Sequence, residues 1–271
     1  MNWRMFAGER ELAQIPADDR GLHYGESLFE TLRSHQGQLP WWSRHWARLV
    51  RGAKRLGLPL PDEQRVKAEA LDLLAGQSAA LKLRLARCGG RGYAAPDAAL
   101  PLWMLAVYPL PAAQAPLHLV WCETRLAQQP QLAGIKHGNR LEQILARREV
   151  QQQGADEGLV CDAEGQVISA TSANLFVLQD GQWRTPLLEN AGVAGVCREY
   201  LLTQTDGQIT ALHPDEVAQA EAVFICNALR GILPVARLGA RLWPQVHPDI
   251  ATLQARLASA HPGFATCLEA S

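Results

Sequence analysis

The sequence has little that would direct the protein to a membrane or to nucleic acid. No apolar run reaches the roughly 20 residues that a bilayer-spanning helix requires. The amino-terminal MNWRMFAGER also lacks the apolar centre of a signal peptide. The 26 basic and 27 acidic residues nearly balance, so we expect no broad positive field for nucleic acid or an anionic membrane. The sequence therefore predicts a cytoplasmic protein whose partner is a small molecule or another protein.

Cysteine is also sparse. The 6 cysteines are spread along the chain with no close pair, so the sequence predicts neither a disulfide framework nor a zinc site, and we expect no metal. Most of these cysteines are expected to be small core residues. A chain of 271 residues is near the upper limit for one domain and comfortable for two, and it can bury a core in either case.

Residues 1–109 are predicted to form a small domain of strands and helices. Alternating or short apolar runs predict three strands, at 28–33, 81–85 and 102–107. The one-sided apolar spacing after Ser43, a plausible N-cap, predicts a helix that ends near Gly57, and a second helix is expected over 63–74. The uncharged segment 110–116, rich in proline and alanine, is interpreted as an interdomain linker.

Residues 117–271 are predicted to form a larger, sheet-rich domain. Strands are expected at 117–122, 158–162, 174–179, 183–188 and 222–227. Asp180-Gly181 is typical of a hairpin turn. A helix should begin at Asn139, which forms a capping-box-like pair with Glu142, and it carries an apolar face of Leu141, Ile144 and Leu145. The fold class is therefore α/β or α+β, with two domains.

The segment LAGIKHGNRLEQ, residues 132–143, places Lys136 just before that helix. A lysine amine becomes a nucleophile only when it loses its proton, which burial or a nearby positive field favours. The partial positive charge at the helix start would bias a desolvated Lys136 towards the neutral amine. A solvated lysine is the alternative, and position alone leaves it open. His137 is expected to point away from Lys136 and to make a structural hydrogen bond rather than act as a base.

Two further features bear on anion binding. AGVAGVCREYLL, residues 191–202, is a glycine-spaced loop that enters a helix near Val196, an arrangement that suits a phosphate, although an ordinary turn before a helix has the same pattern. Arg48 lies on its predicted helix opposite the apolar stripe, together with Arg44, Arg51 and Arg55. The local pattern alone therefore predicts that Arg48 is in water.

The chain resembles the class IV, branched-chain-type family of pyridoxal-phosphate (PLP) enzymes, and within it the lyase branch. The resemblance covers nearly the whole chain. Its most specific parts are DRGLHYGESLFETLR (19–33), HWARL (45–49), GGRGY (89–93), LAGIKHGNRLEQ (132–143), SANLF (172–176), GVAGVCR (192–198) and ICNAL (225–229). It implies a two-domain class IV PLP-dependent aminotransferase-like fold, the cofactor pyridoxal 5'-phosphate and a homodimer.

The resemblance also assigns cofactor roles to individual residues. Lys136 matches the lysine that bonds covalently to PLP, and Arg48 matches the arginine that reaches the PLP phosphate. The resemblance also implies that the backbone of Val196 and Cys197 at the helix start binds the phosphate, and that Asn227-Ala228 makes a second contact on the phosphate side.

One position departs from the family pattern. Where the family usually has a glutamate next to the pyridine nitrogen, this chain has Ser169. A carboxylate there would keep the nitrogen protonated and the ring a strong electron sink, as transamination requires. A hydroxyl can only hydrogen-bond a neutral nitrogen, so we expect Ser169 to tolerate elimination while suppressing transamination.

The activity that the resemblance implies is that of a carbon-oxygen lyase. This reaction converts 4-amino-4-deoxychorismate into 4-aminobenzoate and pyruvate in folate biosynthesis. Arg91 and Tyr93 of the GGRGY loop are expected to bind the substrate, because its two carboxylates suit arginine. Phe29 is a further expected substrate contact, at a place where similar D-amino-acid transaminases carry a tyrosine. The alternatives are a class IV aminotransferase for branched-chain or D-amino acids and a non-catalytic homologue.

Overall fold

The computed structural model describes residues 2–90, 92–96, 99–112 and 116–267. They form two compact units: unit 1 is Met1–Pro111 with Ile135–Asn139, and unit 2 is Ala112–Gly134 with Arg140–Ser271. Of the expected linker 110–116, residues 113–115 lie outside the described part of the chain. The short segment Ile135–Asn139 belongs to unit 1 because its main chain pairs with the sheet of that unit.

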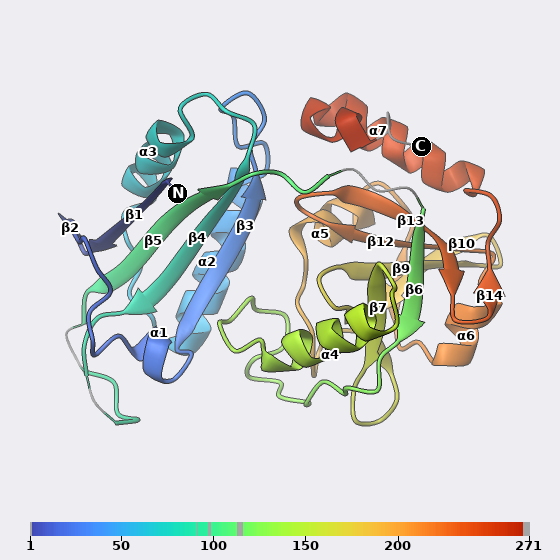
Figure 1. The fold of residues 1–271 in the computed structure, drawn as a ribbon, viewed down its shortest axis with the longest axis horizontal. Coiled ribbons are helices and arrows are strands. Elements are labelled where there is room, and N and C mark those ends of the chain that lie inside the picture. The colour runs from blue at the N-terminus through green and yellow to red at the C-terminus, as the bar shows by residue number, and fades with distance from the viewer. Residues whose placement is uncertain (1, 91, 97–98, 113–115, 268–271) are drawn as a thin grey trace. The chain divides into compact units, whose positions relative to one another are not determined.

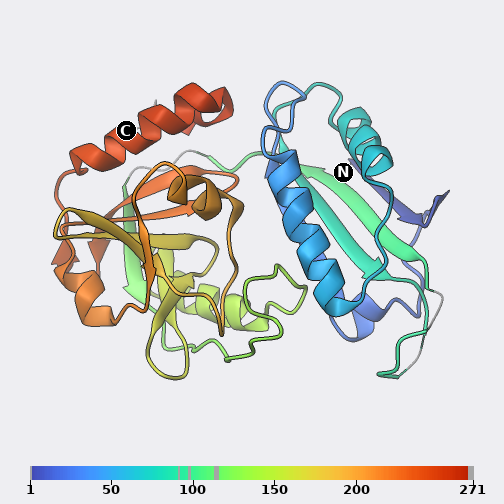
Figure 2. The ribbon, with the colours of Figure 1, turned by 180° about the vertical axis from the view of Figure 1, so that it is seen from behind.

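Unit 1 is a five-stranded antiparallel sheet with a long helix along one face (Figure 1). Its strands are β1 (Asn2–Ala7), β2 (Arg10–Glu11), β3 (Ser27–Arg33), β4 (Ala80–Arg87) and β5 (Pro101–Tyr108), in the order β2-β1-β5-β4-β3. Its helices are α1 (Arg20–His23), α2 (Trp42–Leu56) and α3 (Glu63–Leu74). The predicted alternation of β4 is confirmed, since Leu81, Leu83 and Leu85 are buried. Helix α2 lies in front of the sheet in Figure 2.

The ends of α2 show which local signals determine a helix boundary. The helix ends as predicted, with Gly57 as C-cap in the left-handed conformation (φ 62°). The predicted N-cap Ser43 is wrong, because the helix begins at Trp42 and no side chain caps it. Burial of Trp41 and Trp42, and a 2.9 Å hydrogen bond from the Trp42 indole to Glu63, hold the helix start two residues earlier than a Ser43 cap would place it. Tertiary packing has overridden the capping preference of serine.

Unit 2 is built on a curled, mixed nine-stranded sheet. Its strands are β6 (Leu117–Trp121), β7 (Glu157–Cys161), β8 (Val167–Ala170), β9 (Asn174–Gln179), β10 (Gln182–Pro186), β11 (Gln208–Thr210), β12 (Ala222–Asn227), β13 (Gly231–Leu238) and β14 (Arg241–Leu242). They follow the order β11-β10-β9-β12-β13-β6-β7-β8, with β14 on β13. Its helices are α4 (Leu141–Gln152), α5 (Val196–Leu202), α6 (Pro214–Gln219), α7 (Pro248–Ala260) and the 3-10 helix η1 (Pro262–Cys267). The two-domain mixed α/β fold class is confirmed.

Two local predictions in unit 2 are also confirmed. Asp180 and Gly181 form the β9–β10 hairpin turn with positive φ angles of 51° and 69°. Helix α5 begins at Val196. Burial of Cys122, Cys161, Cys197 and Cys226 agrees with the expectation that most cysteines are core residues. None of the helices in the described ranges is long and apolar enough to cross a membrane.

The start and orientation of α4 differ from the prediction. The helix begins at Leu141 without a side-chain cap. The expected capping box is absent because the Asn139 amide donates to the Gly25 carbonyl, while Glu142 accepts a hydrogen bond from the N–H of Ala127. The expected apolar face is exposed, at 74%, 57% and 48% for Leu141, Ile144 and Leu145. The helix instead packs on its sheet through Ala146 and Val150.

Candidate active site

The segment that carries Lys136 is joined to strand β3 of unit 1. The N–H of Phe29 donates to the Lys136 carbonyl (2.9 Å), and Leu28 and His137 form an antiparallel bridge. Residues opposite each other in antiparallel pairing lie on the same face, so Lys136 is on the face of Phe29 and His137 is on the face of Leu28. The Nζ of Lys136 lies 4.3 Å from the centre of the Phe29 ring. His137 is therefore directed away from Lys136, as expected for an extended segment.

The opposite face of β3 carries a buried ionic cluster that includes Arg48. The expectation that Arg48 is in water is wrong, because Arg48 is only 5% exposed. Its Nε and Nη2 donate to the two oxygens of Glu30 at 2.8 and 2.5 Å, and Nδ1 of His45 lies 2.6 Å from Glu30 Oε2. A guanidinium has five donors in one plane, so this bidentate pair uses two of them and fixes the direction of the plane.

The charge states within this cluster follow from burial and pairing. Burial alone would raise the pKa of Glu30, but the charge and hydrogen bonds of Arg48, aided by His45, bring that pKa down to about 2. Burial lowers the pKa of His45, and the positive charges of Arg48 and Lys136 lower it further against the opposing effect of Glu30. Glu30 is thus ionised and His45 is neutral near pH 7. A neutral His45 leaves Arg48 as the cation of the cluster.

The sequence patterns considered above did not predict Glu30 and His45 as parts of the site, although a signal for them exists. In the alternation of β3, Glu30 occupies an inward position between Leu28 and Leu32. A carboxylate at an inward strand position requires a buried cationic or hydrogen-bonding partner. His45 and Arg48 are three residues apart and therefore share one helix face, so they are suited to supply it.

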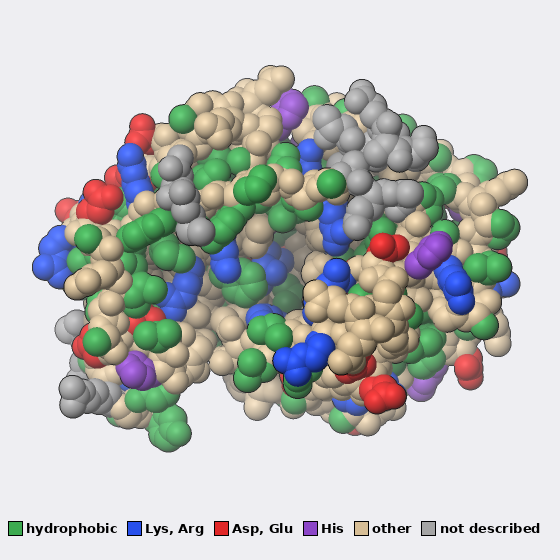
Figure 3. Space-filling model, in the orientation of Figure 1, with side chains coloured by type: hydrophobic (Ala, Val, Ile, Leu, Met, Phe, Trp, Pro, Cys, Tyr) green, Lys and Arg blue, Asp and Glu red, His purple; other side chains and the backbone are tan. Residues whose placement is uncertain are grey.

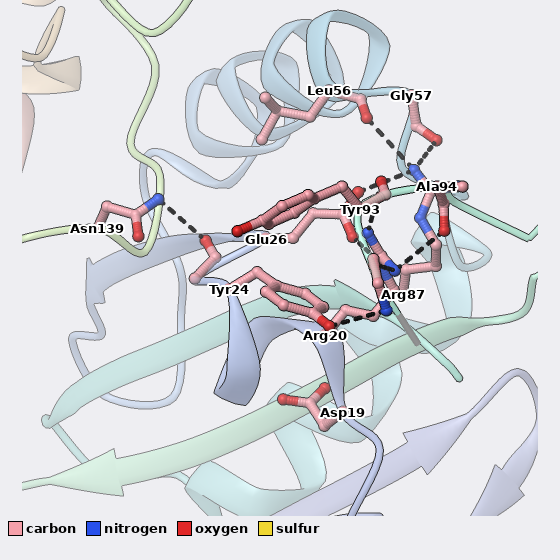
Figure 4. Close-up of polar contacts among 12 residues, drawn as sticks. Asp19, Arg20, Tyr24, Glu26, Leu56, Gly57, Arg87, Tyr93, Ala94 and Asn139 are labelled. Carbon is pink, nitrogen blue, oxygen red and sulfur yellow. Dashed lines mark hydrogen bonds and ion pairs between the residues drawn. The ribbon is translucent and has the colours of Figure 1, made fainter. Parts of the chain in front are cut away.

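The GGRGY loop is held by a buried arginine (Figure 4). Arg20, which is 3% exposed, donates to the main-chain oxygens of residues 92–94 at 2.7–3.2 Å. The N–H of Gly92 donates to the hydroxyl of Tyr24 (2.9 Å). The predicted substrate residue Tyr93 is 92% exposed, and its ring centre lies 5.7 Å from that of Tyr24. The other predicted residue of this loop, Arg91, lies outside the described residues.

A second arginine connects this loop support to helix α2. Arg20 forms an ion pair with Glu26, and Nη2 of Arg87 lies 3.3 Å from the other oxygen of Glu26. Arg87 also donates to the carbonyls of Leu56 and Gly57 at the end of the helix, at 3.3 and 2.8 Å. The sequence indicated none of these contacts, because they join residues that are far apart in the chain. The loop is thereby supported by buried charges rather than by apolar packing.

In unit 2, the glycine-spaced loop leads into α5 through close backbone contacts. Gly134 exchanges hydrogen bonds with it, donating to the Gly192 carbonyl and accepting from the Ala194 N–H, both at 3.0 Å. A Cβ on Gly195 would lie 2.0 Å from Asn174 Oδ1, so a larger residue there would force the Asn174 side chain to move. The first N–H groups of a helix have no partner within it and carry partial positive charge. The start of α5 can therefore bind an anion.

The side chains at the start of α5 contact other parts of unit 2 and hold the helix in place. The Cys197 thiol is buried, and burial together with a hydrogen bond to Cys226 raises its pKa well above the ordinary value. Arg198 donates to Thr185 Oγ1 (3.0 Å) and to the Pro186 carbonyl (2.9 Å), which anchors the helix on β10. The thiol of Cys197 stays protonated, so the group that it can offer to an anion is its main-chain N–H.

The remaining predicted cofactor residues lie at strand ends of unit 2. Asn227 ends β12, and its Oδ1 accepts hydrogen bonds from the N–H groups of residues 229 and 230 at 3.0 and 2.9 Å. Its Nδ2 donates to the Ser172 carbonyl (3.4 Å), and Ala228 begins the turn that follows. Ser169 lies in β8 opposite Val160, and its hydroxyl makes no hydrogen bond to any described residue.

A buried carboxylate that the sequence did not indicate holds the turn after β8. Glu157 is 1% exposed, and its oxygens accept hydrogen bonds from the hydroxyls of Thr171 and Ser172, both at 2.5 Å, and from their N–H groups at 3.2 and 3.1 Å. Because Ser172 also accepts from Asn227, this carboxylate supports the ends of both β8 and β12.

Comparison with known proteins identifies the family. Residues 27–238 match the family described as amino-transferase class IV. The chain is 35% identical over 242 residues to aminodeoxychorismate lyase of Vibrio harveyi, covering 83% of this chain and 88% of that protein. It also resembles the crystal structure of 4-amino-4-deoxychorismate lyase from Pseudomonas aeruginosa, with 39% identity, a TM-score of 0.87, and coverage of 94% and 98%.

A more distant solved structure shares the fold. The branched-chain aminotransferase of the archaeon Thermoproteus uzoniensis, crystallised with norvaline, is 18% identical, with a TM-score of 0.84 and 96% coverage of each chain. The family match over residues 27–238 spans most of the chain, and it includes β3, Lys136 and the start of α5. The protein therefore belongs to the class IV aminotransferase family.

Proposed function

We propose that the protein is a PLP-dependent carbon-oxygen lyase that converts 4-amino-4-deoxychorismate into 4-aminobenzoate and pyruvate. The observation that carries the proposal is the placement of Lys136, whose main chain is fixed on β3 while its amine lies against Phe29. The Vibrio harveyi and Pseudomonas aeruginosa proteins, both named as this lyase, support the substrate and the reaction.

The chemistry of the predicted cofactor residues, taken one by one, suits PLP. Lys136 supplies a primary amine for its aldehyde, and Arg48, held in one direction by Glu30, supplies a cation for its phosphate. The main-chain N–H groups of Val196 and Cys197 follow Gly195, where an added Cβ would lie 2.0 Å from Asn174 Oδ1. The turn at Asn227 and Ala228 is proposed as a second phosphate contact. When bound, PLP withdraws electrons from the substrate carbon attached to the reacting nitrogen.

The protein's own residues then have distinct tasks. With the cofactor bound, the Lys136 amine would be the base that takes up the proton from C4; the C3–O bond would break, and the enolpyruvate released would take up a proton at its methylene carbon to give pyruvate. Aromatisation of the ring supplies much of the driving force. Ser169 has no negative charge with which to keep the pyridine nitrogen protonated. Elimination depends less on a protonated nitrogen than transamination does. Arg91 and Tyr93 are proposed to bind substrate carboxylates.

We further propose a cytoplasmic homodimer that serves folate biosynthesis. The exposed apolar side chains of Leu141, Ile144 and Leu145 on α4 support a protein contact there, because contiguous apolar patches on a protein surface commonly mark interfaces. Light scattering of the purified protein measures the mass. A monomer at micromolar concentration would contradict the dimer.

The function is tested by offering 4-amino-4-deoxychorismate to the purified protein and measuring pyruvate. We expect pyruvate from the wild type and none from Lys136→Ala, while Lys67→Ala, which alters an exposed lysine on α3, behaves as wild type. The wild type should also be yellow and lose that absorbance with borohydride. Conversion of an amino acid with 2-oxoglutarate, without pyruvate release from the lyase substrate, would instead favour the aminotransferase alternative. A protein that takes up no PLP would favour the non-catalytic one.

A further inference from the structure

A second lysine lies beside Phe29 on the face of the unit 1 sheet that carries Lys136. Strand pairing places Phe29 opposite Arg84 and Thr31 opposite Lys82, so these four side chains share one face. Leu28 and Glu30 are on the other face, towards α2. Figure 3 shows basic side chains among apolar ones over these strands.

The two amines lie near one aromatic ring. The Nζ of Lys82 is 5.2 Å from the centre of the Phe29 ring, and the Nζ of Lys136 is 4.3 Å from it. They are therefore within about 10 Å of each other, close enough for their charges to interact. The ring face attracts each cation, but it supplies no counter-charge.

Other basic side chains on this face have partners. Arg84 donates to Asp19 at 2.9 Å, and Arg33 is also engaged. Half-buried Lys82 makes no hydrogen bond or ion pair with any residue in the described part of the chain; its contact is with Phe29. An ammonium group that is partly desolvated beside another amine is stabilised by an external anion. The geometry thus suits a negatively charged group on the face of β3 and β4 that carries Phe29.

We propose that Lys82 binds the ring carboxylate of the substrate, an inference that rests on the proposed lyase function. In 4-amino-4-deoxychorismate this carboxylate is para to the amino group that must reach Lys136. The two amines lie at most about 10 Å apart, which is compatible with a six-membered ring between them, and Phe29 offers an apolar surface against which that ring packs. Lys82 acts as a point charge that selects a carboxylate at the far end of the ring. The product 4-aminobenzoate keeps this carboxylate and binds the same lysine.

The experiment compares holoenzyme variants at position 82. Lys82→Met keeps the aliphatic stem over Phe29 and removes the charge. We expect the KM for 4-amino-4-deoxychorismate to rise about 10- to 100-fold, the effect of losing a hydrogen bond to a charged group, with a much smaller change in kcat. The affinity for 4-aminobenzoate, measured by calorimetry, should fall by a similar factor. Lys82→Arg should retain most of the affinity for the substrate and for 4-aminobenzoate. Lys67→Met is the matched control, because it alters an exposed lysine.

A ligand without the carboxylate separates binding from structural damage. Aniline should bind wild type and Lys82→Met equally, and a variant that loses both ligands alike would overturn the proposal. If Lys82→Met does not fold by circular dichroism, Lys82→Gln carries the same comparison. An active variant whose KM and whose affinity for 4-aminobenzoate are both unchanged would overturn the role of Lys82, but not the lyase function. A wild type that releases no pyruvate would overturn the lyase function and this inference together.

Discussion

Replacing Glu30 with glutamine is expected to destabilise the protein by about 3 kcal/mol or more. Glu30 is 1% exposed, and the lowering of its pKa from 4.5 to about 2 corresponds to about 3 kcal/mol in favour of the ionised form. Removing one partner of a buried ion pair typically costs about 3–5 kcal/mol, which is of similar size. In the variant, Arg48 keeps its charge in a buried place without a carboxylate. The affinity for PLP should fall as well, because Arg48 is no longer held in one direction.

The pH dependence of stability gives a second measure of the same interaction. The pKa of Glu30 is lower in the folded state than in the unfolded state, so its stabilisation is complete above about pH 4.5 and is lost as the pH falls towards 2. The pKa of His45 is also lowered on folding, so its contribution likewise diminishes as the pH falls below 6.5. The difference in unfolding free energy between wild type and Glu30→Gln should therefore shrink between about pH 5 and about pH 2.

Urea denaturation of the full chain, followed by circular dichroism at several pH values, measures these differences. Glu69→Gln is the matched control, because Glu69 pairs with Arg4 at 2.5 Å in a more exposed position and should cost less than about 1 kcal/mol. The double variant Glu30→Gln with Arg48→Met should be less destabilised than the sum of the single variants. A loss below about 1 kcal/mol for Glu30→Gln at pH 7, with the acid sensitivity of the wild type retained, would refute this reasoning.

Three further outcomes follow from the site. Gly195→Ala should weaken PLP binding at least tenfold in a fluorescence titration, because its Cβ would lie 2.0 Å from Asn174 Oδ1; unchanged affinity would contradict the tight start of α5. Arg20→Met should raise the substrate KM and speed amide exchange in residues 92–95, since three carbonyl contacts are lost; exchange at the wild-type rate would count against this support. Ser169→Glu should increase amino transfer from an amino acid to 2-oxoglutarate, and a rate no higher than that of the wild type would contradict the role given to Ser169.

Local patterns in the sequence predicted those elements whose signals are themselves local. The alternation of β4, the left-handed Gly57, the Asp180-Gly181 turn and the start of α5 at Val196 are confirmed because each depends on neighbouring residues. The family was also predicted, since its motifs are short segments in a fixed order.

The wrong predictions share a physical cause. The local pattern predicts Asn139 as the cap of α4, but its amide donates to the carbonyl of Gly25, which is remote in sequence. The arginine-rich helix face predicts Arg48 in water, but a carboxylate on β3 draws it into the interior. Apolar spacing predicts Leu141 on a packed face, yet α4 contacts its sheet through smaller side chains. In each case contacts with residues far away in the sequence contributed as much free energy as the local preference, or more, and so they determined the structure.

The sequence by itself determined the class of fold and the family, because these are encoded in periodicity and in short motifs. Only the tertiary structure decided that Lys136 shares a sheet face with Phe29 and Lys82, and that Glu30 pairs with Arg48 on the opposite face. Sheet register sets these contacts, and a shift of one residue would exchange the two faces. No local propensity specifies that register, so the charges around the site followed from the folded chain as a whole.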